Sequence, residues 1–550
     1  MARIISAEDD VKEEAARPRA LEQKWRILIT VMFGLFMIIL DSTIVNIAFP
    51  TLRAEFGASL SDAQWVISIY VLALGITTPV SGYLADKFHI KRMYLVGLGI
   101  FAFGSLLCGV APSLPLLIAA RALQGFGGGI AQPLGPAQLY RAFPPKEQGT
   151  AFGIMGIALV VAPALGPILG GWLVDINLWR AIFFINVPIG IIAVVWGFFS
   201  LPDYRTGHRP LFDPLGLATA IIGFGSVLYA ASIAEINGWT SFTTIAILTA
   251  GFAALIIHTF IELRVAKEPL MNLRLFENRV FLNASLVGYV ATIALFGAEF
   301  LMPLYLQTFR GRSALEAGVI LLGVAATSAI ATPSAGRLYD KIGPRTIMVV
   351  GFFILCINTW QLAELQATTP IWYIVFLLAL RGLAVGLTLQ TSYVTAMSSI
   401  PLDHLPRGSS LLNSTRFVVQ AIAVAALATI LVSFLSPQVQ AIQQKLQNAP
   451  APSTTQPYGI CETPGVAPED NLPPGVAATI SQLPPAAQAP AKTKTLDLLN
   501  QTCQESMQGF QAAYRITFFA SVGALILAAF LPGWPGKWGG RTAAQPGMVD

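Results

Sequence analysis

The sequence predicts an all-α membrane protein that crosses the bilayer many times. Hydrophobic residues make up 55% of its 550 residues and charged residues only 11%, whereas about a quarter of the residues in soluble domains are charged. The apolar runs are long and continuous, unlike the alternating pattern of a membrane β-barrel. Because about 20 apolar residues let one helix cross the hydrocarbon core, we expect fourteen membrane-spanning helices.

Short polar loops separate most of the expected helices. One hydrophilic stretch, 436–511, is much longer and lies between the last two. The expected spans are 27–48, 63–84, 93–111, 115–138, 149–174, 181–201, 214–234, 242–262, 280–306, 316–338, 346–364, 371–397, 408–434 and 512–532.

The basic residues predict which side of the membrane holds the two ends. An even number of spans puts both ends on one side, and Lys and Arg concentrate in cytoplasmic segments. With both ends inside, the inside segments hold 23 Lys and Arg residues and the outside segments 8. The net charge of +5 therefore reports membrane topology and does not indicate nucleic-acid binding. We expect cytoplasmic tails at 1–26 and 533–550, and no cleaved signal peptide, because 1–26 lacks an apolar core.

The same orientation places the long loop 436–511 outside, with Cys461 and Cys503 in it. An oxidising compartment favours a disulfide between them, in a partly ordered cap with helical pieces near 438–448 and 495–510. The alternative is a disordered loop with two free thiols. Cys108 and Cys356 fall inside spans, where cysteine serves as a small apolar residue.

Two features of the sequence occur twice. Asp86 follows the second span and Asp340 follows the tenth, 254 positions later; Arg121 in the fourth span is matched by Arg381 in the twelfth, 260 positions later. Such similar offsets for different features indicate an internal repeat. We expect two homologous six-helix halves with two further helices inserted between them.

The expected domains follow from this repeat. The first six-helix bundle covers 27–201, the inserted pair 214–262, and the second bundle 280–532, which includes the outside loop 436–511. Parallel halves of this kind place a substrate near the membrane midplane and work by rocking against each other.

Asp41 is the acid that the first span, 27–48, carries within the membrane. A carboxylate there costs at least ~2.5 kcal/mol unless it is protonated, paired or facing water, so it is a candidate proton carrier. The helical rise places Arg121 at the same depth, where its charge would favour the ionised acid. The alternatives are a solvated acid near a helix end and an arginine that reaches up to the outer headgroups.

Other polar and aromatic residues in the spans have two interpretations each. Glu299 either binds a proton or a cationic substrate near the outer mouth, or is simply solvated. His258 and Glu262 lie at the inner end of the eighth span, where we expect solvation. Tyr70 and Tyr305 either stack on aromatic cations or pack in the protein.

Four motifs in the spans and loops together point to one family. The loop motif contains Asp86, which can cap a helix N-terminus and pair with a base across the junction of two helices, or can act only as a topology anchor. The stripe of small residues in the fourth motif lets another helix approach closely, and its proline bends the helix. The motifs are Leu40-Asp41-x-Thr43-Ile44-Val45-Asn46-x-Ala48-x-Pro50, Gly82 to Arg92 with its copy Gly336 to Arg345, Leu117-x-x-x-Arg121-x-x-Gln124-Gly125-x-Gly127, and Ala162-Pro163-Ala-Leu-Gly166-Pro167-Ile-Leu-Gly170-Gly171.

These motifs resemble the major facilitator superfamily, and specifically its fourteen-helix drug:proton antiporters, the EmrB/QacA-like group. The resemblance covers the chain except its tails and the loop 436–511. It implies the superfamily fold, two six-helix bundles plus two inserted helices, in a bacterial cell membrane. The chain departs from the family at His89, where glycine is usual, at Ile90, where a basic residue is usual, and at Ala162, where glycine is usual.

The candidate functional residues fall into five groups. For proton coupling they are Asp41, Arg121 and Glu299; for substrate binding Asp41, Asn46, Tyr70, Gln124 and Tyr305; for the conformational switch Gly82, Asp86, Arg92, Gly336, Asp340 and Arg345; for the antiporter motif Gly166, Pro167, Gly170 and Gly171; and for a disulfide Cys461 and Cys503.

The expected function is proton-driven efflux of amphipathic cationic or neutral drugs by alternating access. The alternatives are an exporter dedicated to an endogenous metabolite or lipid-like compound and, more remotely, a non-transporting scaffold or receptor. An enzyme is not expected, because no phosphate-binding loop, metal-ligand spacing or nucleophile–base set stands out. The expected energy source is a proton gradient without a cofactor, and the partners are a drug-like molecule, protons and the bilayer, with a periplasmic adaptor protein as a candidate.

Overall fold

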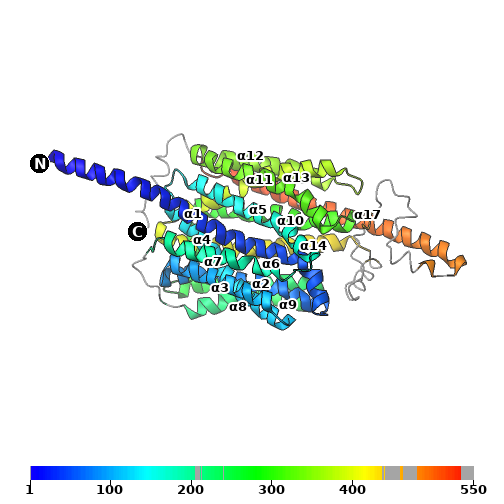
Figure 1. Cartoon of the computed structure of the whole chain (residues 1–550). Helices are drawn as coiled ribbons and strands as arrows, with labels where there is room; N and C mark the ends of the chain where they lie inside the picture. Colours follow the sequence, from blue (N-terminus) through cyan, green and yellow to red (C-terminus); the bar gives the residue numbers. More distant parts are fainter. Residues whose placement is uncertain are drawn as a thin grey trace.

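The computed structural model describes residues 2–204, 211, 213–239, 241–436, 439, 459–461, 480–482 and 484–533; the side chains of 2–21, 60–61, 235–237, 295–300 and 314 are left aside. Every regular element in these ranges is helical. Long helices lie side by side in one elongated bundle (Figure 1). This is the all-α fold that the apolar runs predict.

The helices follow the expected spans closely. The first half consists of α1 (Ala2–Glu55), α2 (Leu60–Phe88), α3 (Ile90–Val110), α4 (Leu114–Ala142), α5 (Gln148–Asp175), α6 (Ala181–Phe184) and α7 (Asn186–Ser200). The inserted pair is α8 (Pro214–Asn237) and α9 (Phe242–Phe260), which continues as a π-helix over Ile261–Val265. The second half consists of α10 (Arg279–Leu304), α11 (Ala314–Ile342), α12 (Pro344–Ala363), α13 (Ile371–Met397), α14 (Leu405–Ser433) and α17 (Pro485–Ala529).

Thirteen spans in the described ranges are long and apolar enough to cross a membrane, with α6 and α7 forming one of them. The apolar part of α10, Arg279–Ala294, is shorter, but α10 as a whole occupies the expected span 280–306. A helix therefore stands at each of the fourteen expected positions.

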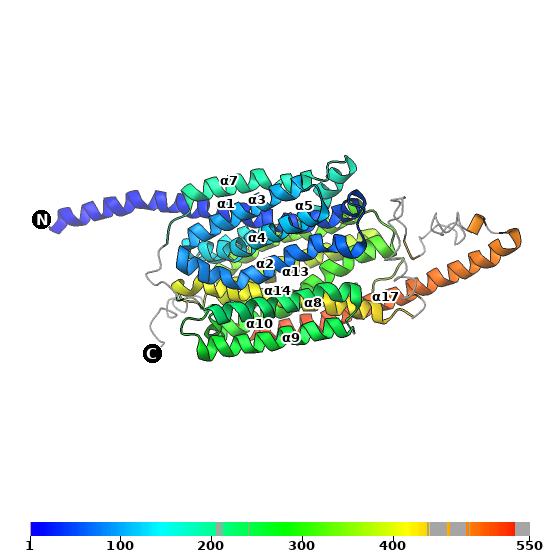
Figure 2. The same ribbon diagram turned by 90° about the horizontal axis from the view of Figure 1, so that it is seen from below.

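The inserted pair packs on the bundle mainly through α8. Contacts of α8 are made with α2 of the first half and α14 of the second, whereas α9 packs on α8. Figure 2 shows α8 and α9 along one flank of the bundle. The helices α5 and α11 form the most extensive contact between the two halves.

The bundle has two ends, named the terminal side and the loop side. The terminal side is where α1 enters the bundle and α17 ends: Lys24 pairs there with Glu147 before α5, and Arg345 after α11 binds the carbonyl of Leu531. The loop side is where α17 begins, projecting beyond the other helices in both views (Figures 1 and 2).

The helix that holds the last expected span, 512–532, begins well before that span. The helix α17 begins at Pro485 and runs unbroken to Ala529, so the expected helical piece 495–510 belongs to it, while 438–448 lies outside the described residues. Residues with good helix propensity, such as alanine, lysine, glutamine and leucine, carry the helix past the apolar core. Polarity marks where a span leaves the membrane, but it does not end a helix.

The disulfide between Cys461 and Cys503 is present, as the outside position of the loop predicts. It ties the segment 459–461 to α17, and that segment also binds the end of the ninth span through Ile460 N–H to Thr308 O (2.9 Å). Cys108 and Cys356 are buried free thiols.

Candidate functional site

Asp41 and Arg121 form a buried ion pair in the middle of the first half. Arg121 Nη1 on α4 donates to Asp41 Oδ2 on α1 at 2.5 Å, and the two side chains are 1% and 0% exposed. Their equal depth predicts this contact, and the structure confirms it. Two opposite charges without water are stable only when further hydrogen bonds satisfy their remaining atoms, so the surroundings of the pair matter.

Two amides complete the shell of the carboxylate. Gln124 Nε2 and Asn186 Nδ2 each donate to Asp41 Oδ1 at 2.8 Å. Gln124 lies one helical turn from Arg121 and accepts from its Nη1 at 2.8 Å through Oε1. The Asp41 cluster, meaning Asp41, Arg121, Gln124 and Asn186, thus holds the carboxylate with three donors from two neighbouring helices.

The guanidinium of Arg121 is held from other directions too. Its Nε donates to the carbonyl of Val66 at 3.0 Å, and its carbon lies 4.1 Å from the ring centre of Tyr70. Tyr70 is itself fixed by a hydrogen bond to the carbonyl of Ile38 (3.1 Å). Tyr70 therefore supports the arginine by a cation–π contact and is buried beneath it.

Asn186 is a member of the cluster that the sequence alone did not reveal. It is the first residue of α7, just after the break between α6 and α7, and its Nδ2 also lies 3.1 Å from Ser105 Oγ. Pro188 follows closely and cannot continue the hydrogen bonds of a preceding helix. An asparagine two residues before a proline inside an apolar run was the available signal.

Three of the candidate residues are placed elsewhere. Asn46 is exposed on α1. Tyr305 is buried in the second half, where its ring stacks on Phe510 with centres 5.0 Å apart and its hydroxyl donates to the carbonyl of Gln366 (2.7 Å). Glu299 belongs to α10, and its side chain lies outside the described part. The structure does not bring Tyr305 to the Asp41 cluster.

The first copy of the switch motif forms an ion pair with a side chain of the other half. Asp86 Oδ2, at the end of α2, accepts from Arg407 Nε on α14 at 2.5 Å, and both side chains are 9% exposed. A Cβ on Gly82 would stand 2.8 Å from the Cα of Arg407, so only glycine allows this approach. The sequence left the partner of Asp86 open, and the structure identifies it as Arg407.

The second copy of the motif binds the N-terminus of helix α5. Asp340, at the end of α11, accepts from the backbone N–H groups of Gly149 (2.8 Å) and Thr150 (2.7 Å) at the start of α5, and from the Thr150 hydroxyl (2.7 Å). These N–H groups have no partner within their own helix. Gly336 packs directly against the backbone of Gly149. Both copies therefore join the halves at the terminal side.

Arg92 and Arg345, the basic residues of the two copies, do not take part in these described contacts. Arg92 is exposed near the start of α3. Arg345 Nε donates to the carbonyl of Leu531 at 2.5 Å, which binds α12 to the end of α17 within the second half.

The departure at His89 has a structural consequence. His89 has φ +73° and ψ +136°, and Gly343 at the same place in the second copy has φ +82°. Residues with a side chain rarely adopt such angles. Both copies thus use one turn geometry, and the first builds it with a strained histidine whose Nδ1 lies 3.9 Å from Asp203 Oδ1.

The antiporter motif lies where α5 passes between two helices. A Cβ on Gly166 would collide with Thr43 on α1, and one on Gly170 would stand 3.0 Å from the carbonyl of Ile44. Pro167 faces Gly318 of α11, whereas Gly171 faces open space. The small residues therefore serve close packing against α1, directly beside the helix that carries Asp41.

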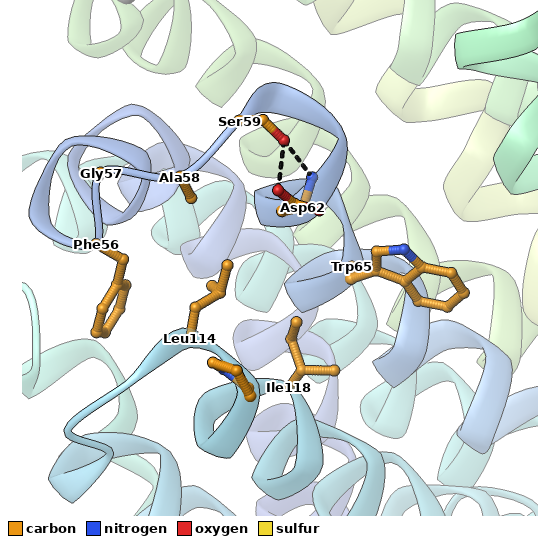
Figure 3. A pocket seen from close by; sticks show the side chains of 9 residues that line it. Phe56, Gly57, Ala58, Ser59, Asp62, Trp65, Leu114 and Ile118 are labelled. Carbon is orange, nitrogen blue, oxygen red and sulfur yellow. Dashed lines mark hydrogen bonds between the residues drawn. The ribbon is translucent and has the colours of Figure 1, made fainter.

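A surface hollow of about 540 Å³ opens on the loop side of the first half, between the α1–α2 connection and the starts of α2 and α4. Figure 3 shows Trp65 and Ile118 on its wall, with Asp62 held by Ser59 at the rim. Ile118 precedes Arg121 by one helical turn, and Trp65 is next to Val66, whose carbonyl binds Arg121. The hollow thus approaches the Asp41 cluster from the loop side.

Comparisons with known proteins agree with this geometry. The family model described as Major Facilitator Superfamily matches residues 31–424. The multidrug export protein EmrB of Haemophilus influenzae is 32% identical over 395 residues, 71% of this chain and 77% of that protein. The riboflavin transporter RibZ of Clostridioides difficile is also 32% identical, over 72% of this chain and 86% of its own length.

A solved structure extends the likeness to the fold. The human organic anion transporter MFSD10 superposes with a TM-score of 0.56 at 13% identity, covering 90% of this chain and 99% of that one. The matched family model spans well over half of the sequence, and it includes α1, α4, both copies of the switch motif and the antiporter motif. The chain is a multi-pass membrane protein that belongs to the major facilitator superfamily.

Proposed function

We propose that this transporter exports amphipathic cationic or neutral molecules in exchange for protons, with Asp41 as the proton carrier. The observation that supports the proposal is the buried Asp41 cluster, in which one carboxylate is held by a guanidinium and two amides without exposure to water. Protonation of that carboxylate would remove its attraction to Arg121 and free the contact between α1 and α4. A site of this kind links proton binding to helix movement.

The hollow on the loop side supports a route for the proton. With the ends of the chain in the cytoplasm, as the basic residues predict, the loop side faces outward and the hollow brings external water within a helical turn of Arg121. In the proposed cycle Asp41 is protonated from outside, the halves rock, the proton leaves to the cytoplasm of a bacterial cell, and substrate binds before the return.

The contacts between the halves support the rocking step. Asp86 with Arg407 and Asp340 with the start of α5 close the terminal side in this structure. Alternating access requires both contacts to break when that side opens. The cluster at Asp41 and the contacts at the terminal side thus supply a proton site and a gate.

Transport in proteoliposomes tests the proposal. A pH gradient should drive a fluorescent cationic dye across the membrane with the wild type, and Asp41→Asn should abolish the driven movement. Asp175→Asn is the matched control, because Asp175 is an exposed acid at the loop-side end of α5 and does not line the hollow. Driven transport that survives in Asp41→Asn would refute the assignment of Asp41.

A second candidate substrate class is favoured by one finding. RibZ, a riboflavin transporter by name, is as similar in sequence as EmrB. A dedicated exporter of a small metabolite is therefore the alternative, and competition by riboflavin against the dye in the same vesicles separates the two. Inhibition by riboflavin with little effect of unrelated cations would favour the metabolite.

A further inference from the structure

A second group of buried titratable side chains lies in the inserted helices, away from Asp41. His258 and Glu262 occupy the end of α9 and the π-helix that follows, and Asp213 caps the start of α8 by accepting from the N–H of Gly216 (2.9 Å). We expected His258 and Glu262 to be solvated. They are 3% and 2% exposed, so that expectation is wrong. The three residues are called the α8–α9 cluster below.

The side chains of this cluster face one another. His258 Nε2 lies 3.7 Å from Glu262 Oε1, and its Nδ1 is 3.1 Å from the Thr219 hydroxyl. A Cβ placed on Gly216 would touch both Asp213 Oδ2 and Glu262 Oε1, so the two carboxylates approach each other there. Two neighbouring carboxylates in a buried site disfavour double ionisation and favour sharing a proton.

Two buried atoms of the cluster could accept a hydrogen bond from a group that carries that proton. His258 Nε2 and Asp213 Oδ2 are buried and have no hydrogen-bond partner among the described residues. Native proteins satisfy nearly all buried polar atoms. A proton placed on either carboxylate could be donated to one of these atoms, which the ionised cluster leaves without a partner.

Glu262 connects the cluster to the contact between the halves. Its carboxylate accepts the backbone N–H groups of Leu270 (3.2 Å) and Met271 (3.1 Å), which fixes the segment after α9. The preceding residue, Pro269, offers its carbonyl to Arg407 Nη1 at 3.2 Å. Arg407 is the residue that pairs with Asp86, so only a few contacts separate the cluster from the terminal-side gate.

The cluster belongs to helices that pack more extensively on the first half than on the second: α8 contacts α2 more extensively than α14. Along α2, Ser232 donates to Ser68 (2.5 Å) and Tyr229 stacks on Trp65. Arg407 belongs to α14 of the second half. Rocking that separates α2 from α14 therefore carries the cluster away from the Arg407 guanidinium.

We propose that the α8–α9 cluster is a second proton-binding site, which takes up a proton when the terminal side opens and releases it when Arg407 returns. The charged groups facing Glu262 are Asp213, His258 and Arg407; Arg264 and Lys267 nearby are exposed. Arg407 is the group that opening removes, so the cluster binds its shared proton less tightly in the closed state than in the open state. This assigns the inserted helices a role as a pH sensor of the gate.

The sign of the effect follows from proton binding. Because the closed state holds fewer protons, lower pH favours the open terminal side, and one linked proton changes the closed-to-open ratio by about tenfold per pH unit. The measurement uses Lys146→Cys and Lys341→Cys, two exposed positions on opposite halves at the terminal side. Spin labels there report the distance between the halves, and the native thiols Cys108 and Cys356 are buried.

The experiment is done with full-length protein in an Asp41→Asn background, which removes the other proposed proton site and needs no transported substrate. Falling pH should still increase the open population, and adding Glu262→Gln should abolish most of that dependence. Adding Glu268→Gln should not, because Glu268 belongs to the same segment but binds Leu211 N–H instead. Asp213→Asn is the second test variant, since asparagine retains the helix cap.

Two results would overturn the proposal. One is an open population that does not depend on pH when Asp41 is replaced by asparagine. The other is a full pH dependence that persists with both Glu262→Gln and Asp213→Asn, which would assign the effect to Asp86 or another group. Neither result bears on whether a proton gradient drives transport, which the vesicle assay decides separately.

Discussion

The two copies of the switch motif both join the halves at the terminal side, but they bind different partners. In the first half, Asp86 binds a side chain, the guanidinium of Arg407. In the second half, Asp340 binds backbone N–H groups at the start of α5. A charged partner can be lost by one mutation and interacts with other charges, whereas backbone donors belong to any sequence. The first contact therefore depends on one charged side chain, whereas the second depends mainly on the backbone of α5.

The buried arginines of the two halves both join neighbouring helices. Arg121 binds Asp41 on α1, and the described contacts of Arg381 include the carbonyl of Ala294 (2.6 Å), Asn358 Oδ1 (3.4 Å) and Thr359 Oγ1 (3.5 Å). Two buried carboxylate–arginine pairs among the described residues, Asp41 with Arg121 and Asp86 with Arg407, both take their carboxylate from the first half.

Removing Asp86 should have the largest effect on the closed state. Asp86→Ala leaves Arg407 buried without its carboxylate, and breaking a buried pair costs about 3–5 kcal/mol. We expect the terminal side to be mostly open, as measured by the distance between spin labels at positions 146 and 341.

The partner of Asp86 supplies the control. Arg407→Met together with Asp86→Ala removes both charges and should restore much of the closed population, because no charge remains buried alone. If the double variant is as open as Asp86→Ala, the pair does not hold the gate.

Asn186 should affect the pH dependence of transport without abolishing it. Asn186→Ala removes one donor to the ionised Asp41, and a hydrogen bond to a charged group is worth about 1.5–3 kcal/mol. Driven transport should therefore keep its dependence on pH but with a half-maximal pH different from that of the wild type. Vesicle transport measured from pH 5 to 9 checks this shift.

The second half offers the matched substitution. Asn358 Nδ2 donates to the carbonyl of Leu377, and its Oδ1 faces Arg381, so Asn358→Ala changes the corresponding region without touching Asp41. An equal shift in both variants would mean that the effect is structural.

The sequence predicted the features that depend on position along one helix. The depths calculated from the helical rise predicted the contact between Asp41 and Arg121. The sequence offset between Asp86 and Asp340 indicated the two halves. It did not predict Arg407 or Asn186 as partners, because each comes from a helix whose rotation only tertiary packing determines. It also misjudged His258, because a position near a helix end says nothing about the segment that folds over it.

Asp340 should respond to mutation less strongly than Asp86. Asp340→Ala leaves two N–H groups at the start of α5 without their acceptor, a loss of about 0.5–2 kcal/mol for a helix cap. Asp340→Asn retains one acceptor oxygen and should lie between alanine and the wild type in closed population. A larger loss than that of Asp86→Ala would show that the backbone contact holds the closed state more strongly than the ion pair does.

The smallest expected effect concerns the turn after each aspartate. His89→Gly relieves a backbone conformation that costs about 1–3 kcal/mol for a residue with a side chain, offset in part by the greater freedom of glycine in the unfolded chain. We expect a net gain of about 1 kcal/mol in the free energy of unfolding, and Gly343→His should produce a loss of similar size. Thermal unfolding in detergent measures both. A lower Tm for His89→Gly would show that the contact of His89 with Asp203 outweighs the strain, and the first copy would then have gained a stabilising partner where the second has only a turn.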